Sequence, residues 1–331
     1  MSEMSTSQIR KQSEAVIRQF GEKWEKHAKE NAKYAKKSIE CFRDCGVGRA
    51  VLCIANGYSF EHELETIKKY QDNVDILCCD KTLGPLLDHG ITPTFCVVAD
   101  ANVSYEKYME KWKDKLDKTI LFMNVCANPK WAQNGNWKDM YFTVNKDVLG
   151  SEKKFGELSG CPNGIAAATN VSGAMVVLLT QSDENGRQNF FGYDKILLIG
   201  FDYSWSDKES YYAFDKYGGG KAHYMRHQLT VREDGEFCYS SGNLLFSAKW
   251  LAKYITTFNL PVIQCTKKTI LSTSRKSTLE KQMQYMFDPE DAKVKNTLNN
   301  LLTQARNQMF LISRELDRIN RKHDLKFLET T

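Results

Sequence analysis

The sequence lacks a long hydrophobic run, because no window of its 331 residues approaches the roughly 20 consecutive apolar residues that a membrane-spanning helix needs. The N-terminal stretch MSEMSTSQIRKQSEA has no apolar segment, so we expect no signal peptide. Net charge is low as well, at +5 from 46 basic and 41 acidic residues, and it does not indicate a nucleic-acid-binding protein. These absences predict a cytoplasmic protein without a transmembrane segment.

The cysteines lack the spacing of a metal site or of a disulfide framework. None of the 10 forms a C-x-x-C pair, and no set of cysteine and histidine has zinc-binding spacing. Cys53, Cys78, Cys79 and Cys96 instead lie inside or at the ends of apolar runs, where a free thiol packs as a small hydrophobic group. We therefore predict reduced cysteines, in agreement with a cytoplasmic location.

What the sequence does contain is an alternation of short apolar runs with helical patterns. The runs are AVLCIA (50–55), VDILCC (74–79), TFCVVA (94–99), TILFMN (119–124), DMYFTV (139–144), KILLIG (195–200) and PVIQC (261–265). The helical patterns lie at 60–70, 103–114, 171–181 and 243–257. Continuous apolar strands are typical of a parallel sheet covered on both faces. The fold class is therefore predicted to be α/β, a Rossmann-like and mostly parallel sheet with helices on both faces.

Two terminal segments flank this pattern. Apolar residues recur at helical intervals over 5–44 and form a nearly heptad stripe over 294–319. Both helices are expected to pack on the core or on each other, and the C-terminal stripe also allows a homo-oligomer. The predicted division is a helical segment at 1–46, a catalytic domain at 47–270 with a loop or lid at 204–242, and a helical segment at 271–331.

The turn in IANGYSFE (54–61) is the first candidate for a binding site. Gly57 permits a tight turn, and the backbone N–H groups and Ser59 then face the start of a helix, where an anion binds readily. Asn56 lies on the same turn. The motif is neither G-x-G-x-x-G nor a Walker motif, and Ser59 has the alternative role of an ordinary N-cap.

Three aspartates follow other predicted strands, at the edge where open α/β sheets bind ligands. They are Asp80, Asp100 and Asp202. Asp100 suits a ribose, a metal ion or the cap of the next helix. Asp202 suits a ligand or the backbone N–H groups of neighbouring loops, which an aspartate at a strand end often holds.

Small residues precede a further helix in NGIAAATNVSGAMVVLL (163–179). Ser172 is either the N-cap of this helix or a contact for a phosphate or a sugar. Gly173 lacks a side chain at a point where a ligand could approach the backbone closely.

A family resemblance joins these motifs. In chain order, 55–59, 171–173, 200–202, 212–215 and 223–227 resemble motifs of the sialyltransferases of glycosyltransferase family forty-two. Tyr-Ala-Phe-Asp at 212–215 and His-Tyr-x-x-His at 223–227 match identically. GITPTFCVVAD and NVSGAMVVLL also look like the motility-associated factor and MptE-like proteins. The resemblance covers roughly residues 50–265.

The resemblance implies a glycosyltransferase that moves a sugar, such as a nonulosonic acid, from a nucleotide donor to a hydroxyl acceptor on a glycan or a protein. His227 would be the general base, since histidine titrates near working pH. Tyr212 and Tyr224 would donate hydrogen bonds to the leaving phosphate. The residues implied to line the donor nucleotide are Asn56, Gly57, Ser59, Asp80, Asp100, Ser172, Gly173 and Asp202. The glycine run beside His223 fits a lid that excludes water.

The chain departs from the sialyltransferase pattern at several positions. Tyr58 stands in place of a proline, and Ser204 aligns with a phosphate-contacting tyrosine. Asp80 and Asp100 stand where those enzymes have nucleotide-contacting asparagines. Two carboxylates would repel a phosphate unless a divalent cation lay between them. No cofactor is strictly implied, but Mg²⁺ is allowed, with Asp100 as its ligand.

Two alternatives stay open. The MptE-like resemblance also allows a Mg²⁺-dependent pyrophosphokinase that uses ATP, in which the three aspartates would bind metal or substrate and His227 would be dispensable. The other alternative is a non-catalytic protein that keeps the nucleotide-binding fold and assembles through its terminal helices.

Overall fold

The structure is a computed structural model that describes residues 6–146, 150–182, 186–206, 212–214 and 227–287. Residues 1–280 form one compact unit and residues 281–331 form another, of which only 281–287 are described. The predicted C-terminal stripe at 294–319 therefore lies outside the described residues, as do Tyr224 and His223.

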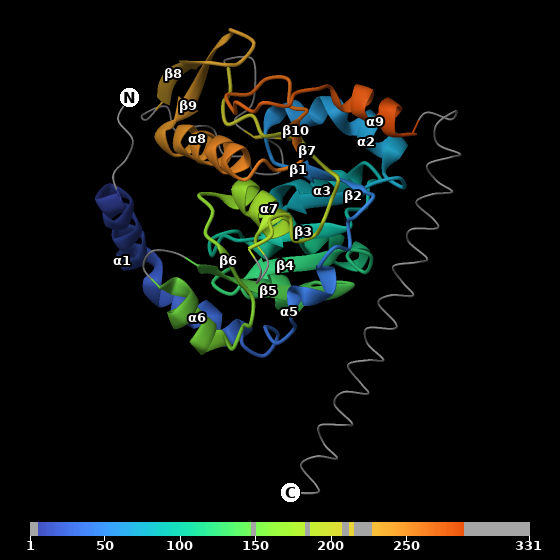
Figure 1. Ribbon diagram of the computed structural model, residues 1–331. Coiled ribbons are helices and arrows are strands. Elements are labelled where there is room, and N and C mark those ends of the chain that lie inside the picture. Colours follow the sequence, from blue (N-terminus) through green and yellow to red (C-terminus); the bar gives the residue numbers. More distant parts are fainter. Residues whose placement is uncertain (1–5, 147–149, 183–185, 207–211, 215–226, 288–331) are drawn as a thin grey trace, which may run out of the picture. The chain divides into compact units, whose positions relative to one another are not determined.

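Eight parallel strands form the central sheet, in the order β10-β7-β1-β2-β3-β4-β5-β6 (Figure 1). Their bounds are β1 Ala50–Ile54, β2 Asp75–Cys79, β3 Phe95–Val98, β4 Ile120–Asn124, β5 Asp139–Lys146, β6 Gly164–Ala166, β7 Lys195–Ile199 and β10 Val262–Gln264. All seven predicted strands are present, and the predicted α/β, Rossmann-like class is confirmed. The strand order reverses at β1, between β2 and β7, which is where ligands bind in this type of sheet.

Helices cover both faces of this sheet. The α-helices are α1 Thr6–Asn31, α2 Leu64–Tyr70, α3 Asp80–Asp88, α4 Tyr105–Tyr108, α5 Lys130–Asn134, α6 Ser151–Ser159, α7 Val171–Thr180, α8 Gly242–Thr257 and α9 Leu279–Phe287. Short 3₁₀ helices are η1 Ile39–Phe42, η2 Tyr58–Glu63 and η3 Glu110–Lys115. Each βα connection brings the next strand back parallel to the last, so the loops after the strands share one edge.

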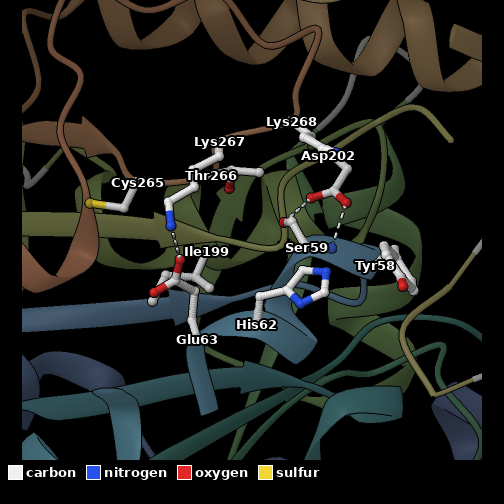
Figure 2. Close-up of a pocket in the computed structure, with 10 residues that line it drawn as sticks. All are labelled: Tyr58, Ser59, His62, Glu63, Ile199, Asp202, Cys265, Thr266, Lys267 and Lys268. Atoms are coloured by element: carbon white, nitrogen blue, oxygen red, sulfur yellow. Dashed lines mark hydrogen bonds and ion pairs between the residues drawn. The ribbon is translucent and has the colours of Figure 1, made fainter. Parts of the chain in front are cut away.

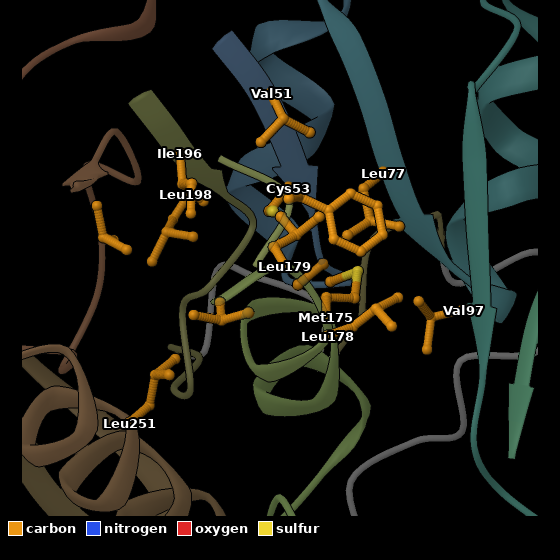
Figure 3. Close-up of a cluster of buried hydrophobic side chains, with 14 of the residues drawn as sticks. Val51, Cys53, Leu77, Val97, Met175, Leu178, Leu179, Ile196, Leu198 and Leu251 are labelled. Carbon is orange, nitrogen blue, oxygen red and sulfur yellow. The ribbon is translucent and has the colours of Figure 1, made fainter. Parts of the chain in front are cut away.

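A hydrophobic core lies between the sheet and α7 with α8 (Figure 3). Alternate residues of each strand face this side, and among them Val51, Cys53 and Leu77 are completely buried. They meet fully buried side chains of α7, such as Met175, and of α8, such as Leu251. The residues between them in sequence face the opposite side, where α3 packs on β2 and β3. Two covered faces explain why the strands are apolar throughout.

The N-terminal helix α1 contacts α6 and the loop after β4. Trp24 of α1 lies edge-on to Phe155 of α6, with ring centroids 6.2 Å apart. His27 Nδ1 bonds the carbonyl oxygen of Cys126 at 3.0 Å, and Asn31 Nδ2 donates to the carbonyl oxygens of Val125 and Ala127 at 2.9 and 3.1 Å. The last turn of α1 therefore satisfies backbone acceptors just beyond β4.

A β-hairpin lies within the segment predicted to be an elaborated loop. β8 His227–Val231 pairs antiparallel with β9 Phe237–Ser241. Leu229 and Phe237 on this hairpin are 66% and 71% exposed, so its apolar residues do not mark a buried strand. Among the described helices, none is both long enough and apolar enough to cross a membrane.

Candidate functional site

The turn after β1 is held against the end of β7. Gly57 N donates to the carbonyl oxygen of Gly200 at 2.9 Å. A Cβ on Gly57 would lie 2.5 Å from that oxygen and 2.6 Å from Cγ of Asp202. The φ of Gly57 is −74°, which any residue can adopt. The position therefore needs glycine because two backbone segments approach closely, and not because the turn itself demands it.

Ser59 and Asp202 close this junction (Figure 2). Asp202 Oδ2 accepts from Ser59 N at 2.8 Å, and Asp202 Oδ1 accepts from Ser59 Oγ at 2.5 Å. Both residues are buried, at 8% and 3% exposure. Asp202 thus has the loop-holding role that was one of its two predicted alternatives. The N-cap of η2 is Gly57 and not Ser59, so the capping alternative for Ser59 is wrong.

The start of α7 is also occupied by contacts within the protein. Asn170 is the N-cap, and its Oδ1 accepts from Gly173 N at 2.9 Å, so the capping role suggested for Ser172 is wrong. Ser172 Oγ bonds Asn170 Oδ1 at 2.9 Å and the phenol oxygen of Tyr203 at 2.9 Å. A Cβ on Gly173 would meet atoms of Asn170 and Trp250 at 3.3 Å. Side chains of the protein therefore lie beside Gly173, where a ligand was expected to approach the backbone.

Asp80 presents a charge that burial opposes. It is the first residue of α3 and is 2% exposed. Its Oδ1 accepts from Lys81 N at 2.7 Å. Burial raises the pKa of Asp80 from 3.8 to about 6, and the negative charge of Asp100 adds to the rise, whereas Lys81 opposes it. Asp80 is therefore poised to lose or gain a proton, or to meet a cation, near neutral pH.

Asp100 follows β3 and is exposed. Its Oδ1 accepts from Asn102 N at 2.8 Å, and Asn102 Oδ1 accepts from Lys23 Nζ of α1 at 2.6 Å. The two predicted aspartates thus share one sheet edge and interact electrostatically. No group of three or more His, Cys, Asp and Glu suited to a metal ion occurs within the described ranges. Two carboxylates fit Mg²⁺ carried by a phosphate ligand better than a resident all-protein metal site.

The Tyr-Ala-Phe part of the 212–215 motif lies over the same edge. Ala213 N donates to the carbonyl oxygen of Asn56 at 3.0 Å. The Phe214 ring packs on Phe60, with ring centroids 5.6 Å apart. Lys81 Nζ lies 4.7 Å from the ring centroid of Tyr212. Two motifs distant in the sequence, at 56 and at 212–214, are therefore in contact.

The predicted general base lies only partly within the described residues. His227 is the first residue of β8, and its backbone pairs with Ser241 of β9. Its side chain, like all of Tyr224, lies outside what the structure describes. Among the predicted site residues, the structure brings Asn56 together with the 212–214 segment through Ala213, Asp80 together with Asp100, and Ser59 together with Asp202.

A comparison with known protein families shows to which family this chain is related. A sequence model of the family described as 6-hydroxymethylpterin diphosphokinase MptE-like matches residues 24–208. The chain belongs to the MptE-like family. The predicted MptE-like relationship is confirmed by this match. No curated protein matches the chain.

Among solved structures with the fold of this MptE-like chain is a bacterial protein. It is described as a MAf glycosyltransferase from Magnetospirillum magneticum AMB-1, and it superposes with a TM-score of 0.58 at 14% sequence identity. The match covers 78% of this chain and 38% of that chain, so the MptE-like chain corresponds to well under half of its neighbour.

A cavity in the MptE-like chain was missed by the sequence analysis. It has a volume of about 130 Å³ and lies between η2 and the loop after β10, with the Ser59–Asp202 pair in its wall (Figure 2). Its lining residues are Tyr58, Ser59, His62, Glu63, Ile199, Asp202, Cys265, Thr266, Lys267 and Lys268. Lys267 pairs with Glu63 at 3.4 Å. The signal was present in the sequence, since Thr266, Lys267 and Lys268 follow the strand predicted at 261–265.

Proposed function

We propose that this chain is a glycosyltransferase that moves a sugar from a nucleotide donor to a hydroxyl acceptor. The observation that carries the proposal is the contact between Ala213 and Asn56, which puts the Tyr-Ala-Phe motif over the turn that follows β1. This contact brings two motifs of the sialyltransferase resemblance to the same place in the fold. The fold neighbour from Magnetospirillum magneticum, itself described as a glycosyltransferase, supports the same class.

The proposed reaction is a single displacement. The donor nucleotide would lie along the edge formed by Asn56, Asp80 and Asp100. Tyr212 would donate a hydrogen bond to the phosphate as the bond to the sugar breaks and the phosphate takes the electron pair. The acceptor hydroxyl would attack the anomeric carbon and give its proton to His227. We further propose a nonulosonic acid as the sugar, as the sialyltransferase resemblance suggests.

Replacement of His227 tests this mechanism. We expect His227→Ala to lower the rate of sugar transfer by about 10²–10⁴-fold, the usual contribution of a general base, and to leave nucleotide affinity unchanged. His62→Ala is the matched control, because His62 packs against Tyr58 in the neighbouring cavity and should not affect transfer. A His227→Ala variant that transfers sugar at the wild-type rate would refute the mechanism.

The second candidate is the pyrophosphokinase activity that the family description suggests. Asp80 and Asp100 favour it, since two carboxylates at one sheet edge suit Mg²⁺ bound to the phosphates of ATP. Thermal shift with CMP, CDP, UDP and ATP, each with and without Mg²⁺, separates the candidates. A shift with ATP that requires Mg²⁺ supports the pyrophosphokinase, and a shift with CMP, CDP or UDP supports the glycosyltransferase. No shift with any nucleotide supports the non-catalytic alternative.

A further inference from the structure

Lys81 holds an unusual position at the candidate site. It is the second residue of α3, directly after the buried Asp80. Its ammonium lies 4.7 Å from the ring centroid of Tyr212 and 5.7 Å from that of Tyr108. No carboxylate of the described residues lies within ion-pair distance of it. Aromatic rings hold the cation in place without neutralising it.

A negatively charged ligand at this edge needs such a cation. Asp80 and Asp100 both carry negative charge there above about pH 6, where Asp80 has lost its proton. Coulomb repulsion would oppose a phosphate beside them. A fixed positive charge offsets that repulsion, and it does so whether or not a divalent cation accompanies the ligand.

Two other lysines nearby are less suited to this role. Lys23 Nζ is bonded to Asn102 Oδ1 at 2.6 Å. Lys107 Nζ lies 5.3 Å from the ring centroid of Tyr108, on α4, and has no comparable contact with Tyr212 among the described residues. Lys81 is therefore the lysine that combines a place beside Asp80 with a contact to the tyrosine proposed to bind the leaving phosphate.

A second polar group at this edge points to a ligand. Oδ1 of Asn56 is buried and has no hydrogen-bond partner among the described residues. The backbone of the same residue accepts from Ala213 N at 3.0 Å, which fixes the turn. A buried acceptor without a donor costs free energy unless a ligand or water supplies one.

We propose that Lys81 binds the phosphate of the nucleotide and that Asn56 Oδ1 accepts a hydrogen bond from an N–H or O–H group of the same ligand. This inference rests on one part of the proposed function, namely that a nucleotide binds at the sheet edge that carries Asn56 and Asp80. In the transfer reaction, the departing phosphate keeps the electron pair of the broken bond to the sugar. Lys81 stabilises that added charge as a full cation and transfers no proton.

The test compares a nucleotide with its nucleoside, because the two differ only in the phosphate that Lys81 would bind. The nucleotide of the set CMP, CDP, UDP and ATP that binds the wild type most tightly is titrated by calorimetry, followed by cytidine, uridine or adenosine to match. We expect Lys81→Gln to weaken nucleotide binding at least about tenfold and nucleoside binding less than about twofold. Lys81→Arg should restore most of the loss, and Lys107→Gln is the matched control that should bind like the wild type.

The outcomes separate this inference from the proposed function. Equal losses for nucleotide and nucleoside would show that Lys81 only positions Tyr212, and unchanged nucleotide affinity would show no role at all; either result overturns the inference and leaves the glycosyltransferase proposal standing. Tightest binding of ATP with the predicted loss in Lys81→Gln would support Lys81 and refute the glycosyltransferase. A wild type that binds none of the four nucleotides, with or without Mg²⁺, overturns both.

Discussion

Asp202 and Asp80 both follow buried strands and are both almost fully buried, yet their surroundings differ sharply. Both carboxylate oxygens of Asp202 accept hydrogen bonds from Ser59. Asp80 receives one hydrogen bond, from Lys81 N, among the contacts described for it, and burial raises its pKa to about 6. The first aspartate holds two loops together, and the second carries a charge that its contacts with Lys81 compensate only in part. A ligand is more to be expected at the second.

Removal of Asp202 should have the largest effect on stability. Asp202→Ala leaves two buried donors of Ser59 without an acceptor, and we expect the free energy of unfolding to fall by about 2–5 kcal/mol. Urea denaturation measures this loss. If the variant does not fold, Asp202→Asn keeps one acceptor and should show a smaller loss. Asp100→Ala is the exposed control, and its free energy of unfolding is expected to lie within about 0.5 kcal/mol of the wild type. Equal losses in Asp202→Ala and Asp100→Ala would contradict the stabilising role of Asp202.

Asp80→Asn should do the reverse and stabilise the protein at neutral pH. Because burial raises the pKa of Asp80 from 3.8 to about 6, the folded state carries a penalty for ionisation that is fully present above about pH 6 and disappears below about pH 4. The free energy of unfolding of Asp80→Asn should therefore exceed that of the wild type by up to about 3 kcal/mol at pH 7.5. This gain should vanish towards about pH 4. Denaturation across this pH range tests the sign. A gain in stability that is independent of pH would exclude buried charge as the cause.

Gly57→Ala tests the close approach behind the Ser59–Asp202 pair. A Cβ at this position would lie 2.5 Å from the carbonyl oxygen of Gly200, so the two loops must separate. We expect a loss of about 1–3 kcal/mol in the free energy of unfolding. Gly242→Ala is the control, since no atom lies within 4 Å of a Cβ there. A Gly57→Ala variant as stable as Gly242→Ala would show that the junction is looser than its geometry implies.

The smallest effect on stability is expected at Ser172. Its replacement tests whether Ser172 has a structural or a ligand-binding role. Ser172→Ala and Tyr203→Phe each remove the same hydrogen bond, so each should cost about 1 kcal/mol, and the double variant little more than the larger single loss. Thermal denaturation gives these values. Nucleotide affinity is then measured on the same proteins. An affinity loss in Ser172→Ala but not in Tyr203→Phe would move Ser172 from the structural group to the ligand-binding group.

The strands could be predicted because two covered faces make them continuously apolar. Where that signal is absent the prediction missed the element: β6 is only Gly164–Ala166, and the β8–β9 hairpin carries its large apolar residues on an exposed face. Of its apolar residues, Leu229, Val231 and Phe237 are exposed and Cys238 is buried, so no continuous run of buried apolar residues reveals the hairpin.

The candidate site was predictable only in part. The rule that polar residues at strand ends face a ligand found Asp80, Asp100 and Asp202, and all three lie at one edge. It could not show that Ser59, 143 residues earlier, uses both oxygens of Asp202, because that pairing exists only in the folded chain. It also left out Lys81, whose interest comes from the ring of Tyr212 and not from its neighbours in sequence.

The docking of α1 matters to anyone who trims the protein for biochemical work. A version cut at residue 47, just before β1, would lose His27 and Asn31 and leave the carbonyl oxygens of Val125, Cys126 and Ala127 open to solvent. It would also lose Lys23, the tether of the loop that carries Asp100. Assays meant to judge catalysis should therefore retain the N-terminal helix, since a shortened protein that fails would say nothing about the chemistry.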